Sequence, residues 1–208
     1  MGNNVTIKIP EDYFDLGYSL YGKDEITLHP YLTVLVGCNG SGKTTFLKIV
    51  EDEIKGDEDT LVIKYNHLWD GRYAKDKALM RGDMETAARM FIASEGEAMK
   101  ANLGELVASI GRQIRNSTAR NVWILLDAMD SGFSIDNIID MKDFFQFLFM
   151  QEKDRVIYVL IAANSFELAR NERCLDVQSM TYTDFADYEE YRDFILETRE
   201  KRDELANE

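Results

Sequence analysis

A glycine-rich segment at residues 37–44 constrains this chain more than any other feature. Its sequence, Gly-Cys-Asn-Gly-Ser-Gly-Lys-Thr, fits the pattern G-x-x-x-x-G-K-[ST] at every position. The apolar run Tyr31–Val36 before it predicts a strand, and the apolar spacing of Thr44–Ile54 after it predicts a helix. Backbone N–H groups in such a loop, together with the positive end of the helix dipole, form a cradle for phosphate. The segment therefore predicts a nucleotide-binding loop.

An acidic residue after a second apolar run is expected to complete this site. Val122–Leu126 is continuously apolar, which predicts a buried strand, and Asp127 follows it directly. In a site of this kind the Lys43 ammonium reaches the β- and γ-phosphates, and the Thr44 hydroxyl coordinates Mg²⁺. A carboxylate at the end of a neighbouring strand is the second metal partner. We therefore expect ATP and Mg²⁺ as ligands, with Thr44 and Asp127 at the metal.

The rest of the chain alternates strand patterns with helical ones, which predicts an α/β fold with a largely parallel sheet and helices on both faces. We expect a single P-loop domain over residues 1–208, with a small helical insert at about 66–93 and an acidic C-terminal helix at about 184–206. The further strands are expected at Val5–Ile9, Glu25–Leu28, Leu61–Tyr65 and Val156–Ala163, and the further helices at about 97–116 and at Ile135–Gln151.

Charge and composition exclude several classes of protein. The 38 acidic residues outnumber the 24 basic ones, giving a net charge of -14, which disfavours direct nucleic-acid binding without excluding it. The longest apolar runs, such as Val156–Ala163, are well short of the roughly 18 residues that span a bilayer, so no membrane association is expected. Two cysteines, Cys38 and Cys174, do not resemble a disulfide framework and favour a reducing, cytoplasmic location.

Four segments resemble the ABC-type ATPases, a class that includes transporter, chromosome-maintenance and DNA-repair heads. The resemblance is closest to small stand-alone AAA-labelled ATPases of phages and bacteria. The first segment is the glycine loop, which is close to the G-x-N-G-S-G-K-[ST] of repair-type heads. The others are Ser94–Glu97 in the place of the class signature, Asp127–Gly132 in the place of Walker B and the D-loop, and Ala162–Ser165 in the place of the switch residue.

The resemblance implies a composite site. Ser94, Gly96 and Glu97 would contact the γ-phosphate of a nucleotide held by a second subunit, so two chains would enclose two ATP molecules. An ATP-dependent homodimer follows as an expectation. The same residues also fit an ordinary capping box at the start of a helix, which leaves a purely structural alternative open. A further protein partner, which the sequence does not identify, stays an open alternative.

Three departures from the class predict weak hydrolysis. Ala128 stands where a glutamate general base normally follows the Walker B aspartate. Asn164 stands at the switch position in place of histidine, and no glutamine lies between Lys43 and Ser94. Asp130 is a candidate for orienting water from a shifted position, with a turn acid as its alternative. These features predict a slow ATPase that acts as a nucleotide-dependent dimerisation switch.

Two other functions stay open. One is an assembly adaptor that binds ATP without hydrolysing it, and the other is a P-loop small-molecule kinase whose lid would supply Arg72, Arg81 or Arg89. A GTPase is disfavoured because no Asn-Lys-x-Asp element is present. The expected catalytic residues are Lys43, Asp127 and Asp130, and the expected nucleotide contacts are Gly37, Asn39, Gly40, Ser41, Gly42, Lys43, Thr44, Thr45, Ser94, Gly96, Glu97 and Asn164; Tyr18 and Tyr21 are candidates for stacking on adenine.

Overall fold

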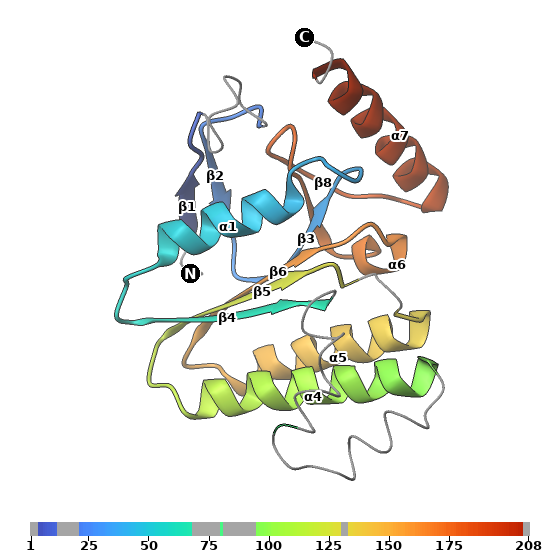
Figure 1. Ribbon diagram of the computed structural model, residues 1–208. Helices are drawn as coiled ribbons and strands as arrows, with labels where there is room; N and C mark the ends of the chain where they lie inside the picture. The colour runs from blue at the N-terminus through green and yellow to red at the C-terminus, as the bar shows by residue number, and fades with distance from the viewer. Residues whose placement is uncertain (1–3, 12–20, 68–79, 81–94, 130–132, 206–208) are drawn as a thin grey trace.

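A six-stranded sheet with the order β4-β5-β6-β3-β7-β8 lies at the centre of the structure (Figure 1). The computed structural model describes residues 4–11, 21–67, 80, 95–129 and 133–205. The first five strands of this order run parallel, and β8 is antiparallel to β7. The strands are β3 (Tyr31–Val36), β4 (Thr60–Asn66), β5 (Asn121–Asp127), β6 (Val156–Ala162), β7 (Arg173–Asp176) and β8 (Thr181–Thr183).

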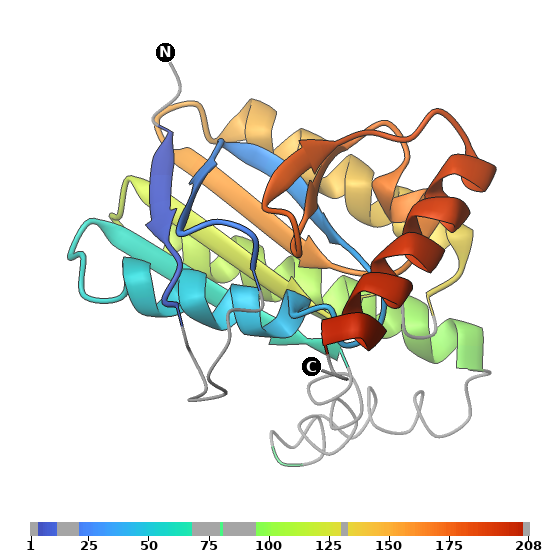
Figure 2. The same cartoon turned by 90° about the horizontal axis from the view of Figure 1, so that it is seen from above.

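Helices cover both faces of this sheet. One face carries α1 (Lys43–Ile54) and a two-stranded antiparallel ribbon of β1 (Val5–Lys8) and β2 (Glu25–Leu28). On the other face α4 (Glu95–Arg115) and α5 (Ile135–Gln151) lie side by side (Figures 1 and 2). The short helix α6 (Phe166–Ala169) follows β6, and α7 (Tyr188–Leu205) ends the chain. The expected α/β class with a largely parallel sheet is confirmed.

The pattern of β5 shows why the sheet is buried on both sides. Val122, Ile124 and Leu126 face the core under α4 and α5, whereas Trp123 and Leu125 face the core under α1. Trp123 stacks on Tyr158 of β6, with ring centroids 4.0 Å apart and an interplanar angle of 8°. A strand that contributes apolar side chains to two cores needs an unbroken apolar sequence, which is why β5 and β6 could be predicted.

The structure corrects several expected boundaries. The C-terminal helix begins at Tyr188 and not at about residue 184, because Asp187 ends the preceding turn and its carboxylate accepts a hydrogen bond from the Glu190 N–H at 3.0 Å. The elements α6, β7 and β8 were not predicted, since each is only three or four residues long. Most of the expected insert, residues 68–79 and 81–93, lies outside the described residues.

Within the part of the chain that the structure describes, no helix has both the length and the apolar character needed to cross a bilayer. Both cysteines, Cys38 and Cys174, are buried, and neither forms a disulfide.

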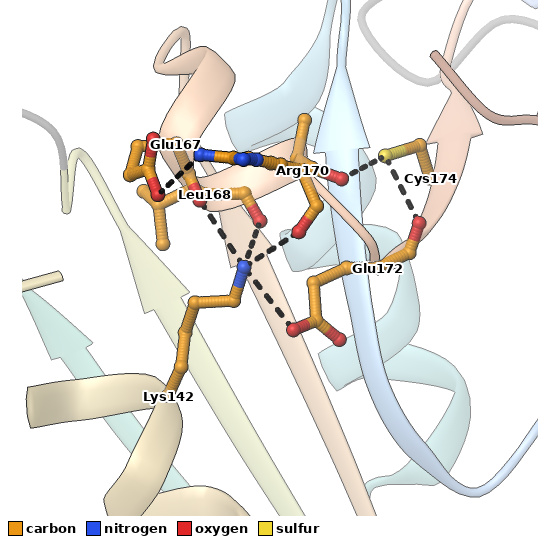
Figure 3. A network of polar contacts seen from close by, with 7 residues as sticks. Lys142, Glu167, Leu168, Arg170, Glu172 and Cys174 are labelled. Carbon is orange, nitrogen blue, oxygen red and sulfur yellow. Dashed lines mark hydrogen bonds and ion pairs between the residues drawn. The ribbon is translucent and has the colours of Figure 1, made fainter. Parts of the chain in front are cut away.

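Lys142 of α5 fixes the segment that follows β6 (Figure 3). Its ammonium donates to the carbonyl oxygens of Glu167, Leu168 and Arg170 at 3.1, 3.4 and 2.8 Å, and it pairs with the Glu172 carboxylate at 3.2 Å. The last carbonyls of a helix have no partner within it, so this cation completes the C-terminus of α6. Cys174, whose thiol donates to the Ala169 and Glu172 carbonyls, belongs to the same network, and burial raises its pKa to about 12.

Replacing Lys142 by methionine should lower the free energy of unfolding by about 2 kcal/mol, because the stem still packs while the carbonyls and Glu172 lose a charged partner. Urea unfolding followed by circular dichroism measures this change. Lys153→Met, at an exposed position just after α5, is the matched control and should stay within about 0.5 kcal/mol of wild type. Equal stabilities for the two variants would show that the network contributes nothing.

Candidate functional site

The glycine loop lies between β3 and α1, at the carboxyl end of a central strand (Figure 2). Two of its glycines are required by the geometry. Gly42 is left-handed, with φ of 97°, and a Cβ there would approach the Tyr21 ring to 3.2 Å. Gly37 has φ of 136°, and a Cβ there would lie only 2.6 Å from the Ser41 Oγ. A side chain at either position would therefore be strained, which explains why glycine stands at both.

Groups inside the loop suit an anionic ligand. Lys43 Nζ donates to the Gly37 and Cys38 carbonyl oxygens at 2.6 and 2.8 Å, so the cation is held within the loop itself. Ser41 is 3% exposed, and its hydroxyl has no hydrogen-bond partner among the residues that the structure describes, which is costly for a buried polar group. Gly42 is the N-cap of α1 and offers no side chain to the first-turn N–H groups. A cation, an unpartnered hydroxyl and an uncapped helix end together fit a phosphate chain.

Thr44 and Asp127 come together as the sequence predicted. Thr44 Oγ1 lies 3.1 Å from each of the two carboxylate oxygens of Asp127, although 83 residues separate them in the chain. Oxygen ligands of this type, a hydroxyl and a carboxylate, are those that Mg²⁺ prefers. Thr44 and Asp127 therefore have the chemistry to hold a Mg²⁺ ion together.

Asn66 is a member of this group that sequence reasoning missed. It is the last residue of β4, where the strand register pairs it with Asp127, and its amide donates to Asp127 Oδ2 at 2.9 Å. This bond fixes the orientation of the carboxylate toward Thr44. A partner of this kind is visible from the sequence only once the neighbouring strand and its register are known.

Asn164 and Asn39, both expected to contact nucleotide, are joined directly. Asn164 follows β6, which lies between β3 and β5, and its amide donates to Asn39 Oδ1 at 2.6 Å. The strand order thus places Asn164 between the loop and Asp127. Lys142 helps to hold Asn164 in this position. Its ammonium fixes α6, and α6 begins at Phe166, two residues after Asn164.

Helix α7 also reaches the loop, which the sequence did not predict. Thr198 Oγ1 accepts a hydrogen bond from the Cys38 N–H at 3.1 Å, and this threonine is 1% exposed. One turn later, Arg202 Nη1 donates to the Asn39 carbonyl oxygen. The Arg202 guanidinium also bonds Asp203, and the hydrogen bonds to this carboxylate raise the pKa of Arg202 above its usual value.

The structure places the remaining expected residues in different ways. Gly96 and Glu97 lie in the first turn of α4, which begins at Glu95, and Thr45 lies half-buried in α1. Tyr21, a candidate for stacking on adenine, is 7% exposed; its ring packs edge-on against Phe46 and its hydroxyl donates to the Gly42 carbonyl at 3.0 Å. Tyr21 therefore supports the loop from within. Ser94, Asp130, Tyr18, Arg72, Arg81 and Arg89 lie outside the described residues.

Ala128 follows Asp127 and adopts a left-handed backbone, with φ of 55°. An alanine side chain can neither accept a proton nor orient water, so this position carries no general base.

Comparison of the chain with models of known protein families finds no match. Comparison with curated protein sequences also finds none.

Proposed function

We propose that this protein binds ATP and Mg²⁺ at the glycine loop, as an ABC-type P-loop ATPase with slow turnover that acts as a nucleotide-dependent dimerisation switch. The contact between Thr44 and Asp127 carries this proposal. It joins the end of the loop to the end of β5 and so brings two motifs that were recognised separately into one site. The parallel sheet supports it further, because the carboxyl ends of such strands are where ligands bind in α/β proteins.

Each part of the site has a distinct role in this proposal. The loop and the start of α1 hold the phosphate chain, and the Lys43 ammonium moves from the loop carbonyls to the β- and γ-phosphates. The Ser41 hydroxyl donates its proton to a phosphate oxygen and so gains the partner it lacks. Thr44 and Asp127 hold Mg²⁺, with Asn66 orienting the carboxylate. Bound Mg²⁺ supplies positive charge to the phosphate oxygens.

Slow turnover follows from Ala128. Without a carboxylate there, the attacking water loses a general base, a group that contributes about 10²–10⁴-fold to rates. The same observation favours a second candidate function, an adaptor that binds ATP only to assemble. A low but measurable rate of phosphate release that Lys43→Ala removes would support the ATPase, and no release above background would support the adaptor.

The position of α4 supports a role for its N-terminus in dimerisation. Because α4 leads into β5, which is parallel to β3, its first turn lies at the same edge of the sheet as the glycine loop, on the opposite face (Figure 1). A helix N-terminus at that edge is suited to bind an anion presented by another molecule. Gly96 and Glu97 would face the γ-phosphate bound by the second copy.

Light scattering with and without ATP and Mg²⁺ tests this proposal. We expect the mass of the wild-type protein to double only with nucleotide. Ser94→Arg should prevent this doubling, because residue 94 directly precedes α4 in the sequence and arginine adds bulk beside the proposed contact. Ala108→Arg, at an exposed position farther along α4, is the matched control and should dimerise normally. A mass that does not respond to nucleotide in the wild type would refute the dimerisation switch.

A further inference from the structure

Three bonds from distant elements converge on the part of the loop formed by Cys38, Asn39 and Gly40. Thr198 of α7 accepts from the Cys38 N–H, and Asn164 donates to the Asn39 side chain. Arg202 donates to the Asn39 carbonyl, and its Cδ and Nη1 lie 3.4 and 3.7 Å from where a Gly40 Cβ would be. This end of the loop is the one next to β3. The other end meets α1 at its N-cap, Gly42.

The approach of Arg202 is fixed by packing. Thr198 lies one turn before it on the same face of α7 and is fully buried at its bond with Cys38. Tyr191, earlier in the helix, is 4% exposed in the core formed by β3, β5 and β6, and Phe194 and Ile195 pack against that core. The helix is thus anchored along its length, and Figure 2 shows its C-terminal end near the start of α1. This anchoring holds Arg202 at the loop.

The positive charge of Arg202 contrasts with the acidic residues of α7 around it. Helix α7 carries seven acidic residues, and the whole chain has a net charge of -14. Among the described residues of α7, Arg202 is nevertheless the charged side chain that bonds the loop, where Lys43 supplies the other cation. Asp203 binds Nε and Nη2 of the guanidinium, whereas the Nη1 that contacts Asn39 faces the loop. A planar guanidinium can bridge a carbonyl and a phosphate oxygen at once.

We infer that Arg202 is a second phosphate-contacting cation, supplied by the same chain, that binds the terminal phosphate of ATP. This inference rests on the proposed function of the loop. In the proposed site the N–H groups at the α1 end surround the inner phosphates, and the Lys43 ammonium reaches from there to the terminal one. The Asn39 end, where Asn164 and Arg202 converge, is then left for the other side of the terminal phosphate. An arginine of this kind stabilises the charge on the transferred phosphate, and supplying it within the chain removes the need for a partner protein to provide it.

The test is calorimetric titration of wild type, Arg202→Ala and Arg202→Lys with a non-hydrolysable ATP analogue and with ADP, each with Mg²⁺. We expect Arg202→Ala to weaken binding of the ATP analogue about tenfold and binding of ADP less than twofold, and Arg202→Lys to fall between. Arg199→Ala is the matched control, because Arg199 lies on the same helix near Asp203 and bonds no loop residue among those described. It should bind both nucleotides like wild type.

Results that contradict the role of Arg202 differ from the result that would contradict the proposed function. Equal loss for both nucleotides, or no loss for either, would show that Arg202 does not contact the terminal phosphate. Tighter binding by Arg202→Ala would show that α7 covers the loop as a barrier, which overturns the inference. If the wild-type protein binds neither nucleotide, the proposed function fails, and this failure is separate from that of Arg202. Thermal unfolding of each variant confirms that the fold is intact.

Discussion

Replacing Lys43 by alanine should weaken the binding of ATP with Mg²⁺ at least 100-fold. The ammonium would make charge-assisted hydrogen bonds to two phosphates, and the loss of about 3 kcal/mol corresponds to a factor of this size. Calorimetric titration measures the effect. The variant also loses the bonds from Nζ to the Gly37 and Cys38 carbonyls, so its thermal midpoint should be recorded beside its affinity.

Lys48→Ala is the matched control for this prediction. Lys48 is an exposed residue on the same helix, and its removal takes away the same charge without touching the loop. We expect its affinity for ATP to equal that of wild type. If the folded Lys43→Ala variant binds ATP as tightly as the wild type does, the glycine loop is not part of the nucleotide site.

Replacing Ala128 by glutamate should raise the rate of ATP hydrolysis about 100-fold or more. The change restores a carboxylate where a general base is missing, and general-base catalysis contributes about 10²–10⁴-fold. The left-handed backbone at this residue already bears a Cβ, so glutamate adds little strain beyond that of alanine. Steady-state release of phosphate measures the rate.

Ala128→Gln is the matched control, because it distinguishes the effect of a proton-accepting carboxylate from the effect of a larger side chain. Glutamine has nearly the size of glutamate but accepts no proton at neutral pH, so this variant should remain as slow as wild type. The double variant Lys43→Ala, Ala128→Glu should also be slow, since it lacks the ammonium on the phosphates. If the glutamate and glutamine variants have equal rates, position 128 is not where the base acts.

The sheet and the central contact of the site could be predicted because their signals are local. The loop, the strand before it and the helix after it are neighbours in sequence, and Asp127 ends an apolar run long enough to identify as a strand. The contact between Thr44 and Asp127 then follows from the geometry of a parallel sheet, whose strands end at the same edge.

The parts that escaped prediction depend on packing between distant segments. Asn66 contacts Asp127 only because β4 pairs with β5 in one register. Thr198 and Arg202 contact the loop only because the apolar face of α7 packs on the sheet, and no motif marks either residue. The short elements α6, β7 and β8 have no periodicity to read, and their places are fixed by neighbours such as Lys142.

The strand order has a consequence for how the chain folds as it is made. β3 lies between β6 and β7, so the ribosome completes the central strand and its loop long before either neighbouring strand exists. Asn39 and Arg202 are 163 residues apart, which corresponds to roughly 8–33 s of synthesis at typical rates. Until β6 is complete at Ala162, the apolar β3 has neither of its neighbouring strands to pair with. Pairing of β3 with its neighbours therefore waits until β6 and β7 are made, and the contact of Arg202 with the loop forms only after α7 has emerged.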